Sequence, residues 1–313
     1  MKVKINFIDS ISIIYNKIIV RYKQLKKHPL VKYPVLGILK YLLLNILLRF
    51  KTKPIIWNWV NDVKYYLMIG DSCLISNCYF YIDDYEEVSF MINYLDKDET
   101  FVDIGSNHGN YTLISSCVVG CKTISVEPIK STFNRLKMNL NLNKCDNVIL
   151  RQVGISDKGG QLKFSNTLGE CNRAIEIKTD QSQETVKVIT LDELLSKETD
   201  ISMLKIDVEG YEKKILLGGM KSLKNKKLDV IQIELNNSNY YYGYDENETI
   251  SILEGYGFKP YKYQPQNKEL LKLNVKNTYR RDTLFIRDID RVRNKLNKKT
   301  VSIDRKKITI EYH

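Results

Sequence analysis

The chain has 313 residues and a hydrophobic content of 43%, which is enough for one large domain with an extension. Its net charge of +12 lies at the two ends, since residues 1–53 carry +11 and residues 287–313 carry +5, which leaves −4 for residues 54–286. A nucleic-acid groove is basic where the site lies, so this distribution argues against a nucleic-acid substrate, whereas basic ends suit an anionic membrane surface or solvated tails.

The cysteines and histidines show no metal-binding pattern. None of the six cysteines forms C-x-x-C, and the chain has three histidines, so a zinc site is not expected. Thiols spread through apolar segments are typical of buried side chains in a reducing compartment, which favours the cytoplasm.

The N-terminal segment has no secretory signal pattern, because residues 1–33 are basic and lack a small-residue cleavage site. Residues 34–50 form an apolar run that is interrupted by Lys40, Asn45 and Arg49. This span is marginal for crossing a bilayer, but it suits a helix at a membrane interface. The alternative is a helix packed against the catalytic domain or a dimer partner. We therefore keep peripheral membrane association through residues 34–50 as one of two expectations.

Strands and helices of a doubly wound α/β domain are predicted after residue 53. Residues 54–82 alternate Ile, Trp, Tyr, Leu and Cys around Gly70-Asp71, which predicts a short antiparallel pair. Residues 86–95 have helical spacing. Continuous apolar runs then predict parallel strands at 101–104, 123–126, 148–153, 201–206 and 230–235. Helices are expected at 111–119, 130–143 and 246–256, a polar loop at 166–185, and a last antiparallel pair at 258–263 and 283–286.

A glycine turn joins the first two of these strands. Residues 102–110 read VDIGSNHGN, and Glu127 ends the strand that follows. This layout holds a nucleoside, because the glycines let the backbone approach it and the acid accepts hydrogen bonds from both ribose hydroxyls. The turn is G-x-x-x-G, whereas a pyrophosphate needs G-x-G-x-x-G. S-adenosylmethionine (SAM), which has no phosphate, therefore suits the turn better.

A second segment, VITLDELL at 188–195 followed by MLKIDVEGYEKKIL at 203–216, is more specific. Together with the glycine turn, it resembles the FkbM family of SAM-dependent methyltransferases, over residues 86–287. The resemblance implies a class I methyltransferase with a Rossmann-like, seven-stranded, mostly parallel sheet and an antiparallel last strand. It also implies a hydroxyl acceptor on a sugar, glycan or natural product. We expect domains at 1–53 (a basic α-helical extension), 54–287 (the methyltransferase domain) and 288–313 (a basic tail).

The predicted cofactor residues surround the glycine turn. Glu127 is expected on the ribose, with capping of the next helix as the alternative. Asp103 is expected near the cofactor's ammonium group, or as a helix cap. Backbone approach at Gly105 and Gly109 and the amides of Asn107 and Asn110 complete the set. His108 is either an acceptor base or an ordinary helix-start residue.

The predicted acceptor residues lie at the carboxyl edge of the sheet, where ligands of open α/β sheets bind. Asp207 is expected to face the methionine end of the cofactor. Glu209 is expected to orient or deprotonate the acceptor hydroxyl, or else to cap the helix after Gly210. Glu234 joins the same rim. Three acids could also bind a divalent cation, but their spacing does not establish it and we predict no metal site.

The favoured hypothesis is a cytoplasmic SAM-dependent O-methyltransferase, with a location at the membrane surface left open. One alternative is an NAD-dependent sugar oxidoreductase, which lacks support because the third glycine of its motif is missing. The other is a non-catalytic, membrane-associated scaffold with the same fold, against which the intact glycine turn and Glu127 argue.

Overall fold

The computed structural model describes residues 7–166, 172–175, 182–278 and 282–313. It divides into two compact units, Met1–Tyr85 with Asp304–Lys307, and Glu86–Ile303 with Ile308–His313. The three domains expected from the sequence stay predictions, because this division into units does not test their boundaries.

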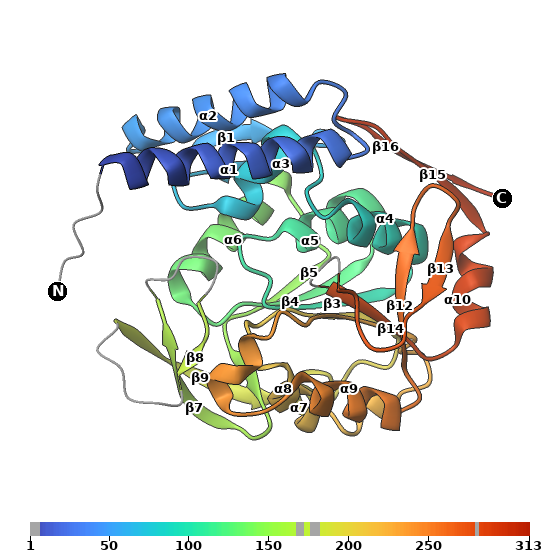
Figure 1. Cartoon of the computed structure of the whole chain (residues 1–313). Helices are drawn as coiled ribbons and strands as arrows, with labels where there is room; N and C mark the ends of the chain where they lie inside the picture. Colours follow the sequence, from blue (N-terminus) through green and yellow to red (C-terminus); the bar gives the residue numbers. More distant parts are fainter. Residues whose placement is uncertain (1–6, 167–171, 176–181, 279–281) are drawn as a thin grey trace. The chain divides into compact units, whose positions relative to one another are not determined.

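The first unit is built on two long helices, α1 (Phe7–Lys27) and α2 (Pro34–Phe50), which lie side by side (Figure 1). Their contact is close at Gly37, where a Cβ atom would lie 2.8 Å from the Leu25 side chain. The α-helical N-terminal extension is therefore confirmed. Among the described residues, no helix combines the length and the hydropathy that a membrane span requires.

The rest of the first unit differs in part from expectation. An antiparallel pair is present as β1 (Ile55–Asn58) and β2 (Lys64–Leu67), but both strands lie before Gly70-Asp71, around which the pair was expected. The extended structure expected for the rest of 54–82 is wrong, because α3 (Ser72–Phe80) follows. Seven of its nine residues are buried, so the helix is enclosed on nearly every side. A short apolar run of this kind does not distinguish a helix from a strand.

The second unit contains an eight-stranded sheet of order β13-β12-β14-β11-β10-β3-β4-β5. Strands β5, β4, β3, β10 and β11 run parallel to one another, while β14 runs antiparallel between β11 and β12. This confirms the class I methyltransferase fold, with one more strand than the expected seven, because β13 is added at the edge. The bounds are Thr100–Ile104 (β3), Lys122–Val126 (β4), Val148–Arg151 (β5), Ile201–Ile206 (β10), Val230–Glu234 (β11), Lys259–Gln264 (β12), Glu269–Lys272 (β13) and Asp282–Ile286 (β14).

Helices cover both faces of this sheet (Figure 1). Every residue of β3, β10 and β11 is buried, which is why these strands read as continuous apolar runs in the sequence. One face carries α4 (Tyr85–Tyr94), α5 (Asn110–Leu113) and α6 (Lys130–Asn143), and the other carries α7 (Leu191–Leu194), α8 (Glu212–Leu217) and α9 (Glu246–Gly255).

A second sheet includes part of the expected polar loop. Its order is β6-β9-β7-β8, and its long strand β9 (Gln183–Thr190) begins inside the segment 166–185. The loop prediction is wrong at this strand and at β8, while residues 167–171 and 176–181 lie outside the described residues. The other strands are β6 (Gly154–Ser156), β7 (Gly160–Ser165) and β8 (Ala174–Ile175). The C-terminal segment, expected as a tail, forms α10 (Ile289–Leu296) and the hairpin β15 (Lys299–Ile303) with β16 (Ile308–Tyr312).

The helix predicted at 111–119 is α-helical only in its first part. It continues from α5 as a π-helix over Ile114–Val119, and Gly120 ends it in the left-handed region. Cys117 in this π-helix forms a disulfide with Cys145, just beyond α6. The expectation that the cysteines are free thiols is therefore wrong for this pair, and the cysteine pattern no longer supports a cytoplasmic location.

Candidate functional site

A row of buried polar residues crosses the centre of the large sheet. Asp103 on β3 pairs in register with Lys205 on β10, and Lys205 pairs with Gln232 on β11. These side chains are 0–3% exposed, although their strands are otherwise mostly apolar. Tyr111 of α5 covers the row: the Lys205 ammonium lies 4.6 Å from its ring centre, and Gln232 Nε2 donates to its hydroxyl at 3.1 Å.

A second row lies two residues further along, at the carboxyl edge of the same strands. Side chains two apart in a strand share one face of the sheet. Gly105, Asp207 and Glu234 occupy this row, and Asp282 on β14 pairs directly with Glu234. A Cβ atom at Gly105 would lie 1.8 Å from the Asp207 carbonyl oxygen, and its φ is +81°. Only glycine fits there, so the backbones after β3 and β10 approach each other at the floor of this edge.

Glu127 closes β4 and holds the glycine turn. It is 6% exposed, and its Oε2 accepts the Asn107 N–H at 3.1 Å while Oε1 accepts the Ile129 N–H at 3.0 Å. A carboxylate has about four acceptor positions, so each oxygen keeps one for a further donor. Burial raises the pKa of Glu127 to about 7, although both backbone N–H groups act in the opposite direction.

Two oxygen atoms in the turn are buried without a hydrogen bond among the described residues: Oδ1 of Asp103 and Oδ1 of Asn107. The other oxygen of Asp103 accepts the Thr112 hydroxyl at 2.7 Å, and burial raises the pKa of this carboxyl. Asn107 itself has φ +51°. Buried acceptors without donors are rare and costly, so N–H or O–H groups of a ligand bound at the turn would satisfy these two atoms.

The remaining residues predicted around the turn take different positions. Gly109 is left-handed and precedes α5, and a Cβ atom there would lie 2.6 Å from Leu136 of α6. Asn110 is the first residue of α5 and is buried. His108 is half-buried, and its carbonyl accepts the Asn139 amide at 2.8 Å. The structure thus gathers this part of the predicted set around one turn.

Three acids meet at the edge of the sheet. Oxygen atoms of Asp207, Glu209 and Glu234 all lie within 4.8 Å of one another. Asn236 bridges two of them, donating to Glu234 at 2.9 Å and to Glu209 at 3.3 Å. Burial first, and then the neighbouring carboxylates, raise the pKa of Glu234 to about 10, so it holds a proton at neutral pH.

The buried ammonium of Lys205 offsets the negative charge of the three acids. Its ammonium donates to Asp207 at 2.7 Å, and the side chain is 3% exposed. Burial lowers the pKa of Lys205, but Asp207, Asp103 and Asp282 outweigh it, so the pKa is raised and the ammonium stays charged. A fixed cation and a protonated acid both weaken binding of a metal ion to these acids.

Glu209 stands on a strained turn. Its φ is +55° and that of Gly210 is +101°, where a Cβ atom would lie 2.5 Å from the backbone of Ser238. The helix α8 (Glu212–Leu217) has Tyr211 as its N-cap, without a side-chain cap hydrogen bond. Its first residue, Glu212, accepts the Val208 and Gly210 N–H groups of the turn at 3.3 and 3.0 Å, and burial raises the pKa of Glu212 to about 8. Glu209 itself lies at the rim and accepts the Asn236 amide.

The four tyrosines in the segment after β11 fall into two groups. Tyr242 donates to the Ala174 carbonyl at 2.9 Å, and Tyr244 donates to the Gly210 carbonyl, so both fix the local backbone. Tyr240 and Tyr241 are exposed, with ring centres 4.1 Å apart. The Arg173 guanidinium lies 3.7 Å from the Tyr241 ring centre. These two rings form an exposed aromatic surface.

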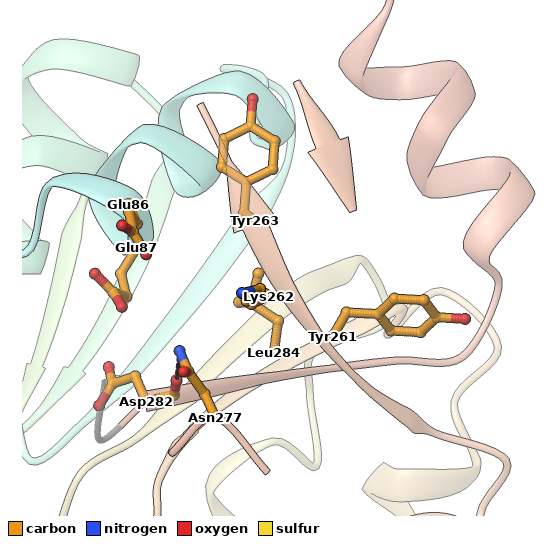
Figure 2. A pocket seen from close by; sticks show the side chains of 8 residues that line it. All are labelled: Glu86, Glu87, Tyr261, Lys262, Tyr263, Asn277, Asp282 and Leu284. Atoms are coloured by element: carbon orange, nitrogen blue, oxygen red, sulfur yellow. Dashed lines mark hydrogen bonds between the residues drawn. The ribbon is translucent and has the colours of Figure 1, made fainter. Parts of the chain in front are cut away.

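A small pocket adjoins Asp282 on the side of α4. Figure 2 shows the carboxylates of Glu87 and Asp282 and the amide of Asn277 directed toward one space. The cavity measures about 10 Å³, which is room for about one water molecule. It is too small to hold a sugar or a nucleoside.

The Methyltransferase FkbM domain profile matches residues 103–260, which include both rows and the glycine turn. The chain belongs to the FkbM methyltransferase family. Hexuronic acid methyltransferase AglP of Haloferax volcanii is 27% identical to it over 148 residues, which are 47% of this chain and 60% of AglP. The chain thus spans about 60% of the length of this relative.

Solved structures resemble this FkbM methyltransferase only slightly. TYW2 of M. jannaschii, in complex with AdoMet, is 13% identical with a TM-score of 0.39, covering 76% of this chain and 88% of TYW2. A Streptococcus mutans protein in complex with SAH is 14% identical with a TM-score of 0.39, covering 64% and 96%. Likenesses of this size carry no conclusion about the ligand of this chain.

Four residues of this site were not predicted from the sequence: Lys205, Gln232, Tyr111 and Glu212. Lys205 and Gln232 were visible as polar residues inside continuous apolar strands, a pattern that indicates a buried partner. Their pairing depends on strand register, which the FkbM sequence pattern does not provide.

Proposed function

We propose that this FkbM family member is a SAM-dependent methyltransferase that transfers a methyl group to a hydroxyl of a sugar, glycan or natural product. The observation that carries the proposal is Glu127, a buried carboxylate at the end of β4 that keeps one acceptor position on each oxygen. A pair of ribose hydroxyls matches those two positions.

The residues of the glycine turn fit the cofactor. Glu127 would hold the ribose, and Asp103 and Asn107 each offer a buried acceptor that has no donor among the described residues. Asp207, Gly105, Gly109 and Asn110 complete the wall of the cofactor site. When bound, SAM supplies a methyl group on a sulfonium, which is already a strong leaving group.

The acceptor side is formed by the rim acids. Glu209 would take the proton of the acceptor hydroxyl, because its partners Asn236 and Ser238 leave its carboxylate at the rim. Burial and the neighbouring acids raise the pKa of Glu234 to about 10, so this carboxyl keeps its proton at neutral pH and does not act as the base. Asp207, paired with Lys205, would orient the methionine end of the cofactor.

A sugar acceptor is favoured by two observations. AglP is a hexuronic acid methyltransferase, and 60% of its length is matched here. Tyr240 and Tyr241 expose aromatic faces on the segment that contacts Gly210, and such faces suit the apolar C–H patches of a sugar ring. The acceptor hydroxyl and the identity of the sugar belong to this proposal.

The test is transfer of labelled methyl from SAM to a panel of hexoses, hexosamines and hexuronic acids, with fluorescence titrations of SAM and NADH beside it. We expect SAM to bind, NADH not to bind, and label to appear on a sugar oxygen. NADH binding without SAM binding would favour the oxidoreductase, and binding of neither would favour a scaffold. A cytoplasmic location, at or away from a membrane surface, stays a further proposal.

A further inference from the structure

The helix α2 is apolar on two opposite faces. One face, with Gly37, Leu44 and Leu48, is buried. At 3.6 residues per turn, the other face is a stripe about 120° wide. Its side chains are 42–81% exposed, and they are Val35, Leu36, Leu39, Leu43, Ile46, Leu47 and Phe50.

Packing within the first unit accounts for the buried face only. Gly37 lies against the fully buried Leu25 of α1, and α2 also lies against α3. Scattered exposed apolar residues are normal, but seven large ones on one stripe of a single helix form a contiguous patch. Such patches mark contacts with a membrane or another macromolecule.

The charge around the stripe favours a lipid membrane over a second copy of the chain as the surface that contacts it. From Ser10 to Asn61 the chain has ten Lys or Arg and no Asp or Glu. Lys40 is exposed in the middle of α2, and Arg49, Lys51 and Lys53 are exposed at its end. A second copy would bring the same excess of positive charge to the contact, which opposes self-association through this face. An anionic lipid surface is complementary to both the apolar stripe and the cations.

We propose that this stripe of α2 docks the protein on an anionic lipid bilayer, with the helix axis in the plane of the interface. The helix of 17 residues is about 26 Å long, shorter than the hydrocarbon core of a bilayer. In the interfacial orientation the apolar side chains enter the acyl region, while Lys40 and the C-terminal cations reach the headgroups. The proposal does not depend on the methyltransferase activity.

The test is flotation of the full chain with vesicles of phosphatidylcholine alone and with vesicles of a two-to-one mixture of phosphatidylcholine and phosphatidylglycerol. We expect the protein to float with the anionic vesicles, and the variant Leu39→Glu/Leu43→Glu to lose at least tenfold in partitioning. Lys51→Gln/Lys53→Gln should lose part of the binding and become less sensitive to salt. Glutamates placed at the exposed Met138 and Met220, which lie outside the stripe, are the matched control and should float as the wild type.

Circular dichroism and SAM titration of each variant check that it is folded. Wild-type protein that stays at the bottom of the gradient with both vesicle types would overturn the proposal, as would flotation of Leu39→Glu/Leu43→Glu equal to the wild type. A dimer in light scattering that this variant abolishes, without lipid binding, would assign the stripe to a second copy instead.

Discussion

Replacing Glu127 by alanine tests the ribose assignment, because the substitution removes two charge-assisted hydrogen bonds from the cofactor. At about 1.5 kcal/mol each, their loss weakens binding of S-adenosylhomocysteine (SAH) by about 3 kcal/mol, or roughly 150-fold. The same substitution also deprives the N–H groups of Asn107 and Ile129 of their acceptor. The loss of affinity alone therefore does not separate a direct contact from a disturbed glycine turn.

A comparison of SAH with its 2′-deoxy analogue by calorimetry makes that separation. The wild type should bind the analogue about tenfold more weakly, the value of one such hydrogen bond, while Glu127→Ala should discriminate less than twofold. Glu184→Ala is the matched control, because Glu184 also accepts a backbone N–H at the start of α6, from Lys130 at 3.3 Å. It should keep the tenfold preference. If Glu127→Ala also keeps it, the ribose assignment is wrong.

Four further predictions concern the acceptor base, the pH dependence, the metal requirement and the disulfide. Glu209→Gln should lower kcat about 100-fold or more with SAH affinity unchanged, and an unchanged kcat would remove Glu209 as the base. SAH binding should weaken about tenfold from pH 8 to pH 6, because Glu127, with a pKa of about 7, is mostly protonated at pH 6 and then cannot accept both ribose hydroxyls. The SAH affinity of Glu127→Gln should not change between these pH values. The stability of the ligand-free protein should depend on pH in the opposite direction. Because the pKa of Glu127 is raised in the folded state, its protonation stabilises the fold. This contribution is fully present below pH 4.5, the ordinary pKa of the group, and is lost as the pH rises through about 7. EDTA should leave activity unchanged, because Lys205 already balances the rim acids, and an activity restored by Mg²⁺ after EDTA would contradict this. Cys117→Ser and Cys145→Ser should each lower the free energy of unfolding in urea by about 3–4 kcal/mol, because the disulfide closes a loop with a sequence separation of 28. The double variant should lose no more than either single variant. A loss under about 1 kcal/mol would show that the disulfide contributes little to stability.

The central strands could be predicted closely from the sequence. Residues 201–206 were expected as a strand and form β10 with the same bounds, and β3 begins one residue before its expected start. Helices cover both faces of these strands, so most positions are apolar and the pattern is strong. The meeting of Asp207, Glu209 and Glu234 was also predictable, because the carboxyl ends of parallel strands share one edge.

The second sheet was not predictable by the same reasoning. Its strands β6 and β8 have three and two residues, which is too short for alternation to show. The helix α3 was missed for a different reason, since its buried residues lie on nearly every side and leave no period. In both places tertiary packing decides the local structure.

Contacts between side chains on neighbouring strands were the part of the site that was hardest to predict from the sequence. Lys205 lies close to Asp207 along the chain, but its neighbours in the sheet, Asp103 and Gln232, belong to β3 and β11, which are distant in the sequence. The disulfide between Cys117 and Cys145 likewise depends on how the π-helix and α6 pack. Neither the neighbours of Lys205 nor the disulfide can be inferred from spacing along the chain.

The most direct test of the account is a crystal structure of the full chain with SAH bound. We expect the adenosine at the carboxyl edge of β3 and β4, with both ribose hydroxyls within hydrogen-bond distance of the Glu127 carboxylate and the sulfur facing the rim near Glu209. A nucleoside bound elsewhere, or a ribose whose hydroxyls contact other groups while Glu127 contacts only backbone N–H groups, would contradict it.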